Sequence, residues 1–115
     1  MVRGEIYFLD LHPRSGSEQS GRRPGIIVSH DSFNSVPAWQ SITVLPLTTS
    51  PRWLRPSPTT VLFGRGEYGL PKECAALAHQ ITTVDRSKLI PPALGRVVGQ
   101  KLGAIDEAIR NYLDL

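Results

Sequence analysis

The chain has 115 residues, of which 40% are hydrophobic and 20% are charged, with a formal net charge of +3. This length fits one globular domain, 1–115, that buries roughly two thirds of the surface its unfolded chain would expose. No run of about 18 apolar residues occurs, and the opening stretch MVRGEIYF meets charge at its third residue. We therefore expect neither a membrane span nor a signal peptide, and a cytoplasmic location.

The position of the positive charge is more informative than its total. Through residue 65 the basic residues are seven arginines, set against four acidic residues, whereas from residue 67 onward six basic residues balance six acidic ones. Arginine presents a rigid fork of donors that matches phosphate oxygens. The first half of the chain is therefore a candidate surface for a phosphate-bearing partner.

The first elements are expected at residues 5–11 and 25–30. EIYFLDL (5–11) and GIIVSH (25–30) are aromatic or β-branched, which predicts strands, and HPRSGSEQSGRRP between them reads as a long loop. A loop of about a dozen residues in a compact domain is usually functional or mobile. DSFN (31–34) is expected to open one helical turn with Asp31 as its cap.

Further strands are predicted at 41–48, 59–63 and 74–85. SITVLPLT (41–48) carries Pro46, which suggests an edge strand or a bulge, and the proline-rich loop SPRWLRPSP separates it from TTVLF (59–63). CAALAHQITTVD (74–85) reads as one or two strands. Its Cys74, the single cysteine, is expected to be a small buried thiol.

The last part of the chain changes from strand-like to helical periodicity. Apolar residues recur there every three or four positions, at Leu94, Val98, Leu102, Ile105, Ile109 and Leu113. Glycines weaken the first half of this stripe, so a firm helix is expected over about 100–112. The predicted fold class is α+β: a small, strongly curled antiparallel sheet, like an SH3-like barrel, with a C-terminal helix.

The loop GSEQSGRRP holds the residues best suited to chemistry on a phosphate. Glu18 and Arg23 can meet at the rim of the sheet, where Pro24 restricts the backbone just before a buried strand. From the residues alone, an exposed ion pair worth about 0 to 1 kcal/mol explains the pair equally well. No sequence spacing typical of a zinc site, a P-loop or a dinucleotide-binding turn occurs.

Four motifs in order give the chain a family resemblance. G-S-E-Q, then R-P before a β-branched strand, then P-L-T-T-S, then H-Q-I-T-T-V-D follow one another between residues 16 and 85, and the similarity covers residues 3–113. This combination resembles the MazF/PemK family of toxin–antitoxin endoribonucleases, whose PemK/CcdB-like fold agrees with the sheet and helix predicted above. The resemblance implies a metal-independent, sequence-specific enzyme without a cofactor, which cuts single-stranded mRNA and so inhibits translation and growth.

The resemblance also implies a set of site residues. It places the family's functional arginine at Arg23, its threonine at Thr48 and its loop glutamate at Glu18, which are the catalytic candidates. The RNA-binding candidates are Ser17, Gln19, Arg22, Thr49, Trp53 and Gln80. Two departures leave the base preference open, because His79 replaces the acidic residue before Gln80 and Thr82 stands where some members have arginine.

The expected reaction is attack of the RNA 2′-hydroxyl on the adjacent phosphorus, which leaves a 2′,3′-cyclic phosphate and a 5′-hydroxyl end. Arg23 suits charge stabilisation on the phosphate oxygens, and Thr48 can add a hydroxyl hydrogen bond. The general base is either Glu18 or Arg23. We favour Glu18, because a guanidine with a pKa above about 12 is almost entirely protonated at neutral pH.

The partners implied are single-stranded RNA, a cognate antitoxin with an acidic segment, and a second copy of the chain in a homodimer. SPRWLRP combines Trp53 with Arg52 and Arg55, a pairing that suits nucleotide stacking, although a partner-facing loop fits it as well. The alternative function is a CcdB-like toxin, which binds DNA gyrase without catalysis. That alternative predicts that Arg23 and Thr48 are dispensable.

Overall fold

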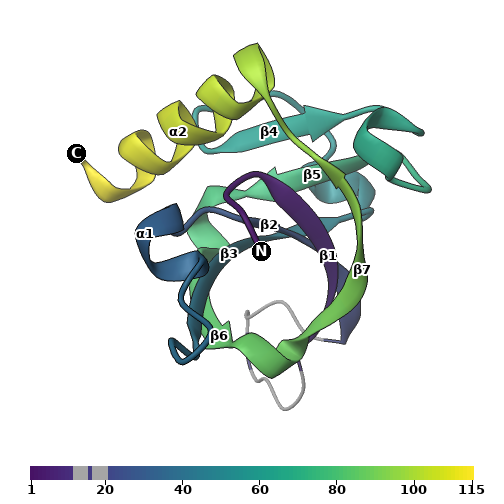
Figure 1. The fold of residues 1–115 in the computed structure, drawn as a ribbon. Helices are drawn as coiled ribbons and strands as arrows, with labels where there is room; N and C mark the ends of the chain where they lie inside the picture. Colours follow the sequence, from purple (N-terminus) through teal and green to yellow (C-terminus); the bar gives the residue numbers. More distant parts are fainter. Residues whose placement is uncertain (12–15, 17–20) are drawn as a thin grey trace.

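The fold was obtained as a computed structural model, which describes residues 1–11, 16 and 21–115. Seven strands and two α-helices alternate with short 3₁₀ turns (Figure 1). The elements are β1 (Glu5–Asp10), β2 (Arg22–Ile27), α1 (Asp31–Asn34), β3 (Ser41–Thr48), η1 (Pro51–Trp53), β4 (Thr60–Phe63), η2 (Glu67–Gly69), β5 (Cys74–Leu77), η3 (Ala78–Gln80), β6 (Thr82–Asp85), η4 (Arg86–Lys88), β7 (Leu89–Arg96) and α2 (Gly99–Leu113).

The strands form one antiparallel sheet in the order β4-β5-β3-β2-β1-β7, and β6 also pairs with β3. Figure 1 shows this sheet curling, so that β6, which lies beside β3, comes round toward β7, which lies beside β1. The helix α2 covers β4. The predicted curled antiparallel sheet with a C-terminal helix is confirmed. The barrel is not closed, however, since among the described strands β4 pairs only with β5 and β7 only with β1.

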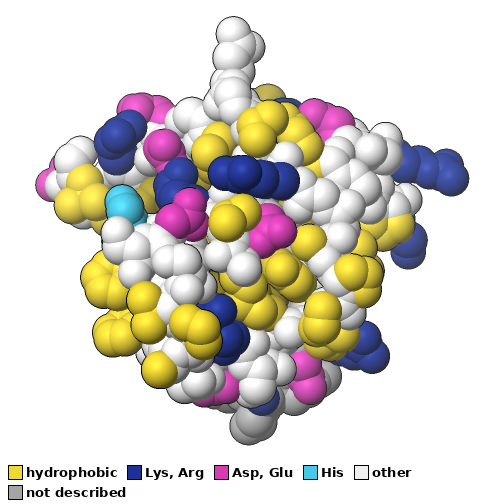
Figure 2. Space-filling model, in the orientation of Figure 1, with side chains coloured by type: hydrophobic (Ala, Val, Ile, Leu, Met, Phe, Trp, Pro, Cys, Tyr) yellow, Lys and Arg dark blue, Asp and Glu magenta, His cyan; other side chains and the backbone are white. Residues whose placement is uncertain are grey.

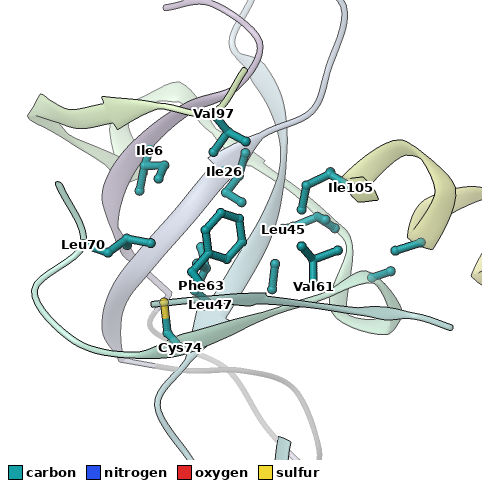
Figure 3. Close-up of a cluster of buried hydrophobic side chains, with 13 residues drawn as sticks. Ile6, Ile26, Leu45, Leu47, Val61, Phe63, Leu70, Cys74, Val97 and Ile105 are labelled. Carbon is teal, nitrogen blue, oxygen red and sulfur yellow. The ribbon is translucent and has the colours of Figure 1, made fainter. Parts of the chain in front are cut away.

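The central strands are buried on both faces. Successive side chains point to opposite sides of the sheet, and each side is covered by its own hydrophobic cluster. On one face, Ile6, Ile26 and Leu45 join the cluster beneath α2 that Figure 3 shows around Phe63. On the other face, Leu9 and Ile27 belong to a second cluster inside the curl. This double burial explains why β1 and β3 read as nearly continuous apolar runs.

Pro46 lies in a central strand, so the expectation of an edge strand is wrong. It is the register partner of Gly25 on β2. On its other side, β3 pairs with β6 as far as Val44 and with β5 from Leu47 onward. Pro46 therefore stands where the partner strand changes, and its missing N–H costs the sheet little at that position.

The C-terminal periodicity is only partly helical. Residues 100–112 lie in α2 as expected, and Ile105 is fully buried in the cluster beneath the helix. Leu94, by contrast, belongs to β7, which the sequence reading did not predict, and Val98 precedes the helix and is about half exposed. The apolar spacing thus ran across a strand–helix boundary. The pairing of β7 with β1 outweighed this helical spacing at Leu94.

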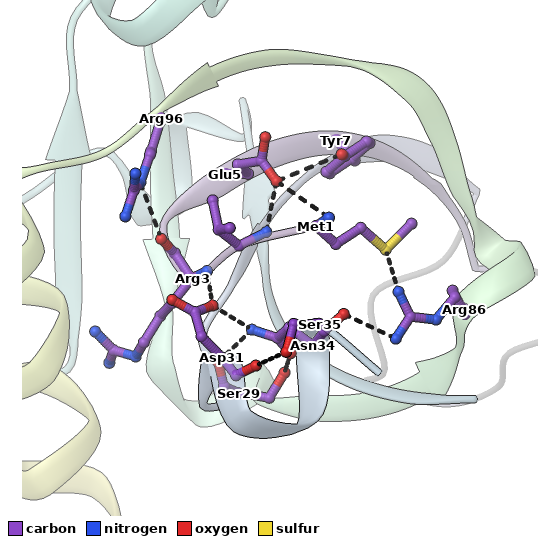
Figure 4. A network of polar contacts seen from close by, with 11 residues as sticks. Met1, Arg3, Glu5, Tyr7, Ser29, Asp31, Asn34, Ser35, Arg86 and Arg96 are labelled. Atoms are coloured by element: carbon purple, nitrogen blue, oxygen red, sulfur yellow. Dashed lines mark hydrogen bonds and ion pairs between the residues drawn. The ribbon is translucent and has the colours of Figure 1, made fainter. Parts of the chain in front are cut away.

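The segment around α1 is tied to the rest of the molecule by polar contacts (Figure 4). Asp31 does not cap the helix as predicted, because the cap is His30, whose Nδ1 accepts from the Ser32 N–H at 2.9 Å. The Asp31 carboxylate instead accepts from the backbone N–H of Arg3 and from the side chain of Asn34. Asn34 is one of only two buried polar side chains among the described residues, and its amide is paired with Asp31, with the Ser29 hydroxyl and with the Ser29 backbone oxygen.

The segment that follows α1 leaves apolar side chains at the surface. Phe33, Val36 and Trp39 are each about half exposed, and Figure 2 shows hydrophobic side chains gathered over this part of the molecule. The Arg86 guanidinium fixes the segment by donating to the backbone oxygens of Asn34, Val36 and Trp39. Within the described residues, no helix has both the length and the apolar character that crossing a membrane requires.

Candidate active site

Arg23 and Thr48 lie on the same face of the sheet, toward the same end. Gly25 of β2 and Pro46 of β3 are register partners, and each candidate lies two residues further along its strand in the direction of that end. Because side chains alternate with a period of two, both point to the face occupied by the cluster inside the curl. Two residues far apart in sequence are thereby turned toward one region.

Arg23 is held at the end of β2 by its neighbours on β1. It is the register partner of Leu9, and its side chain is partly buried. Gly25 on the same face leaves the space that the Leu9 side chain fills, because a Cβ there would lie 2.3 Å from Leu9 Cδ1. Burial lowers the pKa of the Arg23 guanidinium.

Thr48 is the second buried polar side chain of the described residues, with 5% of its surface exposed. Its Oγ1 accepts a hydrogen bond from the backbone N–H of Ser50 at 3.2 Å. That bond uses the oxygen as an acceptor, so the hydroxyl hydrogen can still be donated to a ligand oxygen. The bond also fixes the hydroxyl where β3 ends.

Arg22 and Thr49 line a hollow beside Arg23. The hollow has a volume of about 250 Å³, and Arg23 itself forms part of its wall. Arg22 is exposed and alternates with Arg23, so it belongs to the opposite face of β2. The strand end therefore presents guanidinium groups toward both faces. Arg22 lies on the face of the hollow, and Arg23, although its strand position faces Thr48, also forms part of the wall of the hollow.

The loop after β3 and the turn after β5 bring Trp53 against His79, the residue before Gln80. Trp53 of η1 packs on His79 of η3 with ring centroids 4.8 Å apart, and Gln80 is the next residue of that turn. Arg52 lies 5.0 Å from the centre of the Trp53 ring. Burial, and then the Arg52 charge, lower the pKa of His79, so the imidazole is neutral at pH 7.

Ser17, Glu18 and Gln19 lie outside the described residues, so the structure gives no geometry for these three predictions. Within the described part of the chain, no group of three or more His, Cys, Asp or Glu side chains is placed to hold a metal ion. The arrangement that can be built rests on arginine, threonine and aromatic side chains. Such groups bind phosphate oxygens and nucleobase faces.

The sequence pattern did not reveal two contributors to these surfaces, Tyr112 and Lys72. The Trp53–His79 pair extends to Tyr112 of α2, whose ring centroid is 6.3 Å from that of His79. Lys72 lines the hollow with Arg22 and Arg23. No local pattern signals such contacts between distant segments. Lys72 could only have been noticed as the one cation in the motif GLPKEC.

Sequence comparison finds relatives that span the whole chain. The family model described as "PemK-like, MazF-like toxin of type II toxin-antitoxin system" matches residues 2–113. Endoribonuclease MazF9 of Mycobacterium tuberculosis is 37% identical over 118 residues, covering 100% of this chain and 98% of the relative. Endoribonuclease EndoA of Bacillus subtilis is 29% identical over 113 residues, covering 98% of this chain and 94% of the relative.

Solved structures agree with this match. An endoribonuclease from a mycobacterial species, in complex with its cognate antitoxin, superposes with a TM-score of 0.76 at 28% identity, covering 100% of this chain and 96% of the other. MazF from Deinococcus radiodurans, at 21% identity, shares the fold with a TM-score of 0.80, covering 100% of this chain and 97% of the other. The chain therefore belongs to the PemK-like, MazF-like family of toxins of type II toxin–antitoxin systems.

Proposed function

We propose that this toxin is a sequence-specific endoribonuclease that cuts single-stranded RNA without a metal ion. The observation that carries the proposal is the placement of Arg23 and Thr48 on one face at one end of the sheet, in a chain 37% identical to a protein named an endoribonuclease. The substrate is mRNA, and its cleavage inhibits translation and growth. Single-stranded RNA is favoured because its unstacked bases expose the edges that are read.

The bond changes in the proposed step balance without a co-reactant. The 2′-hydroxyl oxygen forms a bond to phosphorus, and the bond from phosphorus to the 5′-oxygen breaks. The products are a 2′,3′-cyclic phosphate and a 5′-hydroxyl end. One proton leaves the attacking hydroxyl, and one is added to the leaving oxygen. No electron is gained or lost, so neither an oxidant nor a reductant takes part.

Arg23 and Thr48 act on the charge that builds up on the phosphate oxygens. The Arg23 fork donates two parallel N–H bonds to these oxygens, and its partial burial strengthens them by reducing solvent screening. The Thr48 hydroxyl donates a further bond from a position fixed by the Ser50 N–H. Glu18 is our choice for the general base and Arg23 the alternative, because a guanidinium is almost entirely protonated at neutral pH.

The proposed partners follow from the family and from the charge of the chain. The toxin acts as a homodimer, binds a cognate antitoxin and works in the cytoplasm. A mycobacterial relative 28% identical to this chain was solved in complex with its cognate antitoxin. An acidic antitoxin segment complements the arginines of the first 65 residues. The sequence preference depends on His79 and Thr82, the two positions that depart from the family pattern.

The competing function is a CcdB-like toxin that binds DNA gyrase. The relatives that match are named endoribonucleases, which favours the nuclease. The deciding experiment incubates the purified protein with mixed-sequence RNA in EDTA and maps the ends, beside Arg23→Ala purified in parallel. We expect 5′-hydroxyl ends at a short recurrent sequence, formed much more slowly by the variant. Intact RNA, or equal cleavage by both preparations, contradicts the proposal.

A further inference from the structure

The hollow beside Arg23 has a floor without charge. Leu47, Leu70 and Cys74 line it and are almost completely buried, and they belong to the cluster that Figure 3 shows. Burial raises the pKa of the Cys74 thiol to about 11, so the thiol is neutral at physiological pH. Phe8 and Pro24 complete an apolar surface of the kind on which a flat ring packs.

The rim of the hollow is cationic. Arg22, Arg23 and Lys72 are its charged residues, and none of the described residues that line it is acidic. Lys72 comes from the turn that leads into β5, whereas the two arginines come from β2. The three positive charges therefore converge from segments about fifty positions apart in the sequence.

The turn before Lys72 is held firmly against β7. Gly69 has a φ of +80°, and a Cβ there would lie 2.0 Å from the Leu94 oxygen. Gly95 on β7 is packed as closely, since its Cβ would lie 2.1 Å from the Tyr68 oxygen. The Gly66 N–H also donates to the Leu70 oxygen at 2.8 Å, which closes the turn. Lys72 follows this closed turn by two residues.

An apolar floor under a positive rim matches a ligand with a flat ring and a negative charge. A free phosphate would gain nothing from the floor, and an acidic side chain has no ring to cover it. We propose that the hollow holds the nucleotide next to the scissile phosphate, and that Lys72 binds a backbone phosphate of that nucleotide. This inference rests on the proposed function, because Arg23 belongs to both sites.

The first test measures binding of the intact protein to a 2′-O-methyl RNA that contains the mapped cleavage sequence and cannot be cut. Fluorescence anisotropy over a salt series compares wild type, Lys72→Gln and Lys72→Arg. Lys72→Gln is expected to bind about fivefold more weakly and to lower the slope of log affinity against log salt by about 0.7, the value for one phosphate contact on a single strand. Lys72→Arg keeps the charge and should restore both quantities.

The matched control is Arg110→Gln, which removes one positive charge from an exposed position of α2 outside the hollow. Its affinity should stay within twofold of wild type. Equal losses in Lys72→Gln and Arg110→Gln would reduce the effect to net charge and overturn the subsite. Affinity and salt slope unchanged in Lys72→Gln would overturn it as well.

A second measurement reports on the floor and does not depend on activity. Methyl resonances of Leu47 and Leu70 are recorded with and without the 2′-O-methyl RNA, and Val84, which packs against the cluster inside the curl, is the reference. We expect shifts at both leucines that exceed the shift at Val84. Shifts caused equally by inorganic phosphate would mean a bare anion site and overturn the nucleotide assignment.

The two proposals fail separately. Wild type that cuts RNA in EDTA while Lys72→Gln binds normally and Leu70 does not shift would overturn the subsite and leave the nuclease standing. Wild type that leaves RNA intact, yet binds a mixed-sequence 2′-O-methyl RNA through Lys72 and Leu70, would support a nucleotide site in the hollow and overturn the nuclease. Lys72 is exposed, so Lys72→Gln is expected to fold like wild type.

Discussion

Adjacent arginines at the start of β2 allow a direct comparison of chemistry with binding. Arg23 is partly buried and lies on the face of Thr48, whereas Arg22 is exposed and lies on the opposite face. We predict that Arg23→Ala loses about 10² to 10³ in the single-turnover rate at saturating RNA, the effect of removing one donor to transition-state charge. Arg23→Lys keeps a charge but loses the fork, and it should lose about tenfold.

Arg22→Ala should show a different signature. The loss of one exposed phosphate contact weakens RNA binding and lowers the salt slope by about 0.7, but the rate at saturating RNA should stay within about threefold of wild type. The assay is quenched single-turnover cleavage over a range of protein concentrations, with thermal unfolding of each variant to verify folding. A rate for Arg23→Ala within threefold of wild type, or equal rate losses in both variants, would refute the assignment.

Three further predictions concern the aromatic pair, its titration and the helix. Trp53→Ala should weaken binding of 2′-O-methyl RNA by about 5- to 100-fold, the cost of one lost stacking platform, and Trp53→Phe by much less; equal affinities in anisotropy would count against stacking. The pKa of His79 is lowered, so the unfolded chain binds the proton more readily, and stability should fall as the pH drops below about 6.5. Urea unfolding at pH 5 and 7.5 should show a smaller loss for His79→Gln, and an identical loss would disprove the contribution. Ile105→Ala should cost about 2 to 5 kcal/mol in the free energy of unfolding, against within about 0.5 kcal/mol for the exposed Leu113→Ala; similar costs would mean that α2 does not pack as described.

Local patterns predicted the strands that are buried on both faces. The range 41–48 was predicted as β3 has it, because its run of β-branched and apolar residues fills two clusters at once. The strand expected at 25–30 occurs at Arg22–Ile27 instead. The polar sequence at Arg22 and Arg23 does not indicate a strand. The strand begins there because both residues pair with β1.

β7 could not be predicted because its sequence argues against a strand. LIPPALGR holds two adjacent prolines, which remove two backbone donors, and Leu94 fitted the helical spacing of the residues that follow. The strand forms because Leu89 and Ile90 pair with β1, and Gly95 lets the Tyr68 turn approach closely. These are contacts with distant segments, which no window of the sequence contains.

The candidate site likewise contains residues that sequence motifs identify and one residue that only the fold reveals. Arg23 and Thr48 were named from motifs, and the register of β2 and β3 explains why two such distant motifs face one region. Trp53 packs on His79, the position at which this chain departs from the family pattern, and burial lowers the pKa of that imidazole. Lys72 had no motif to mark it and becomes visible only when β2 and the turn before β5 meet.

The most direct measurement of the account is a double-mutant cycle on the single-turnover cleavage rate, using Arg23→Ala, Thr48→Val and the combined variant. Thr48→Val removes the hydroxyl at nearly constant volume and should cost about 10- to 100-fold. If both side chains stabilise one phosphate, the combined variant should be little slower than Arg23→Ala alone. A combined loss equal to the product of the two single losses would contradict the claim that they act on the same phosphate.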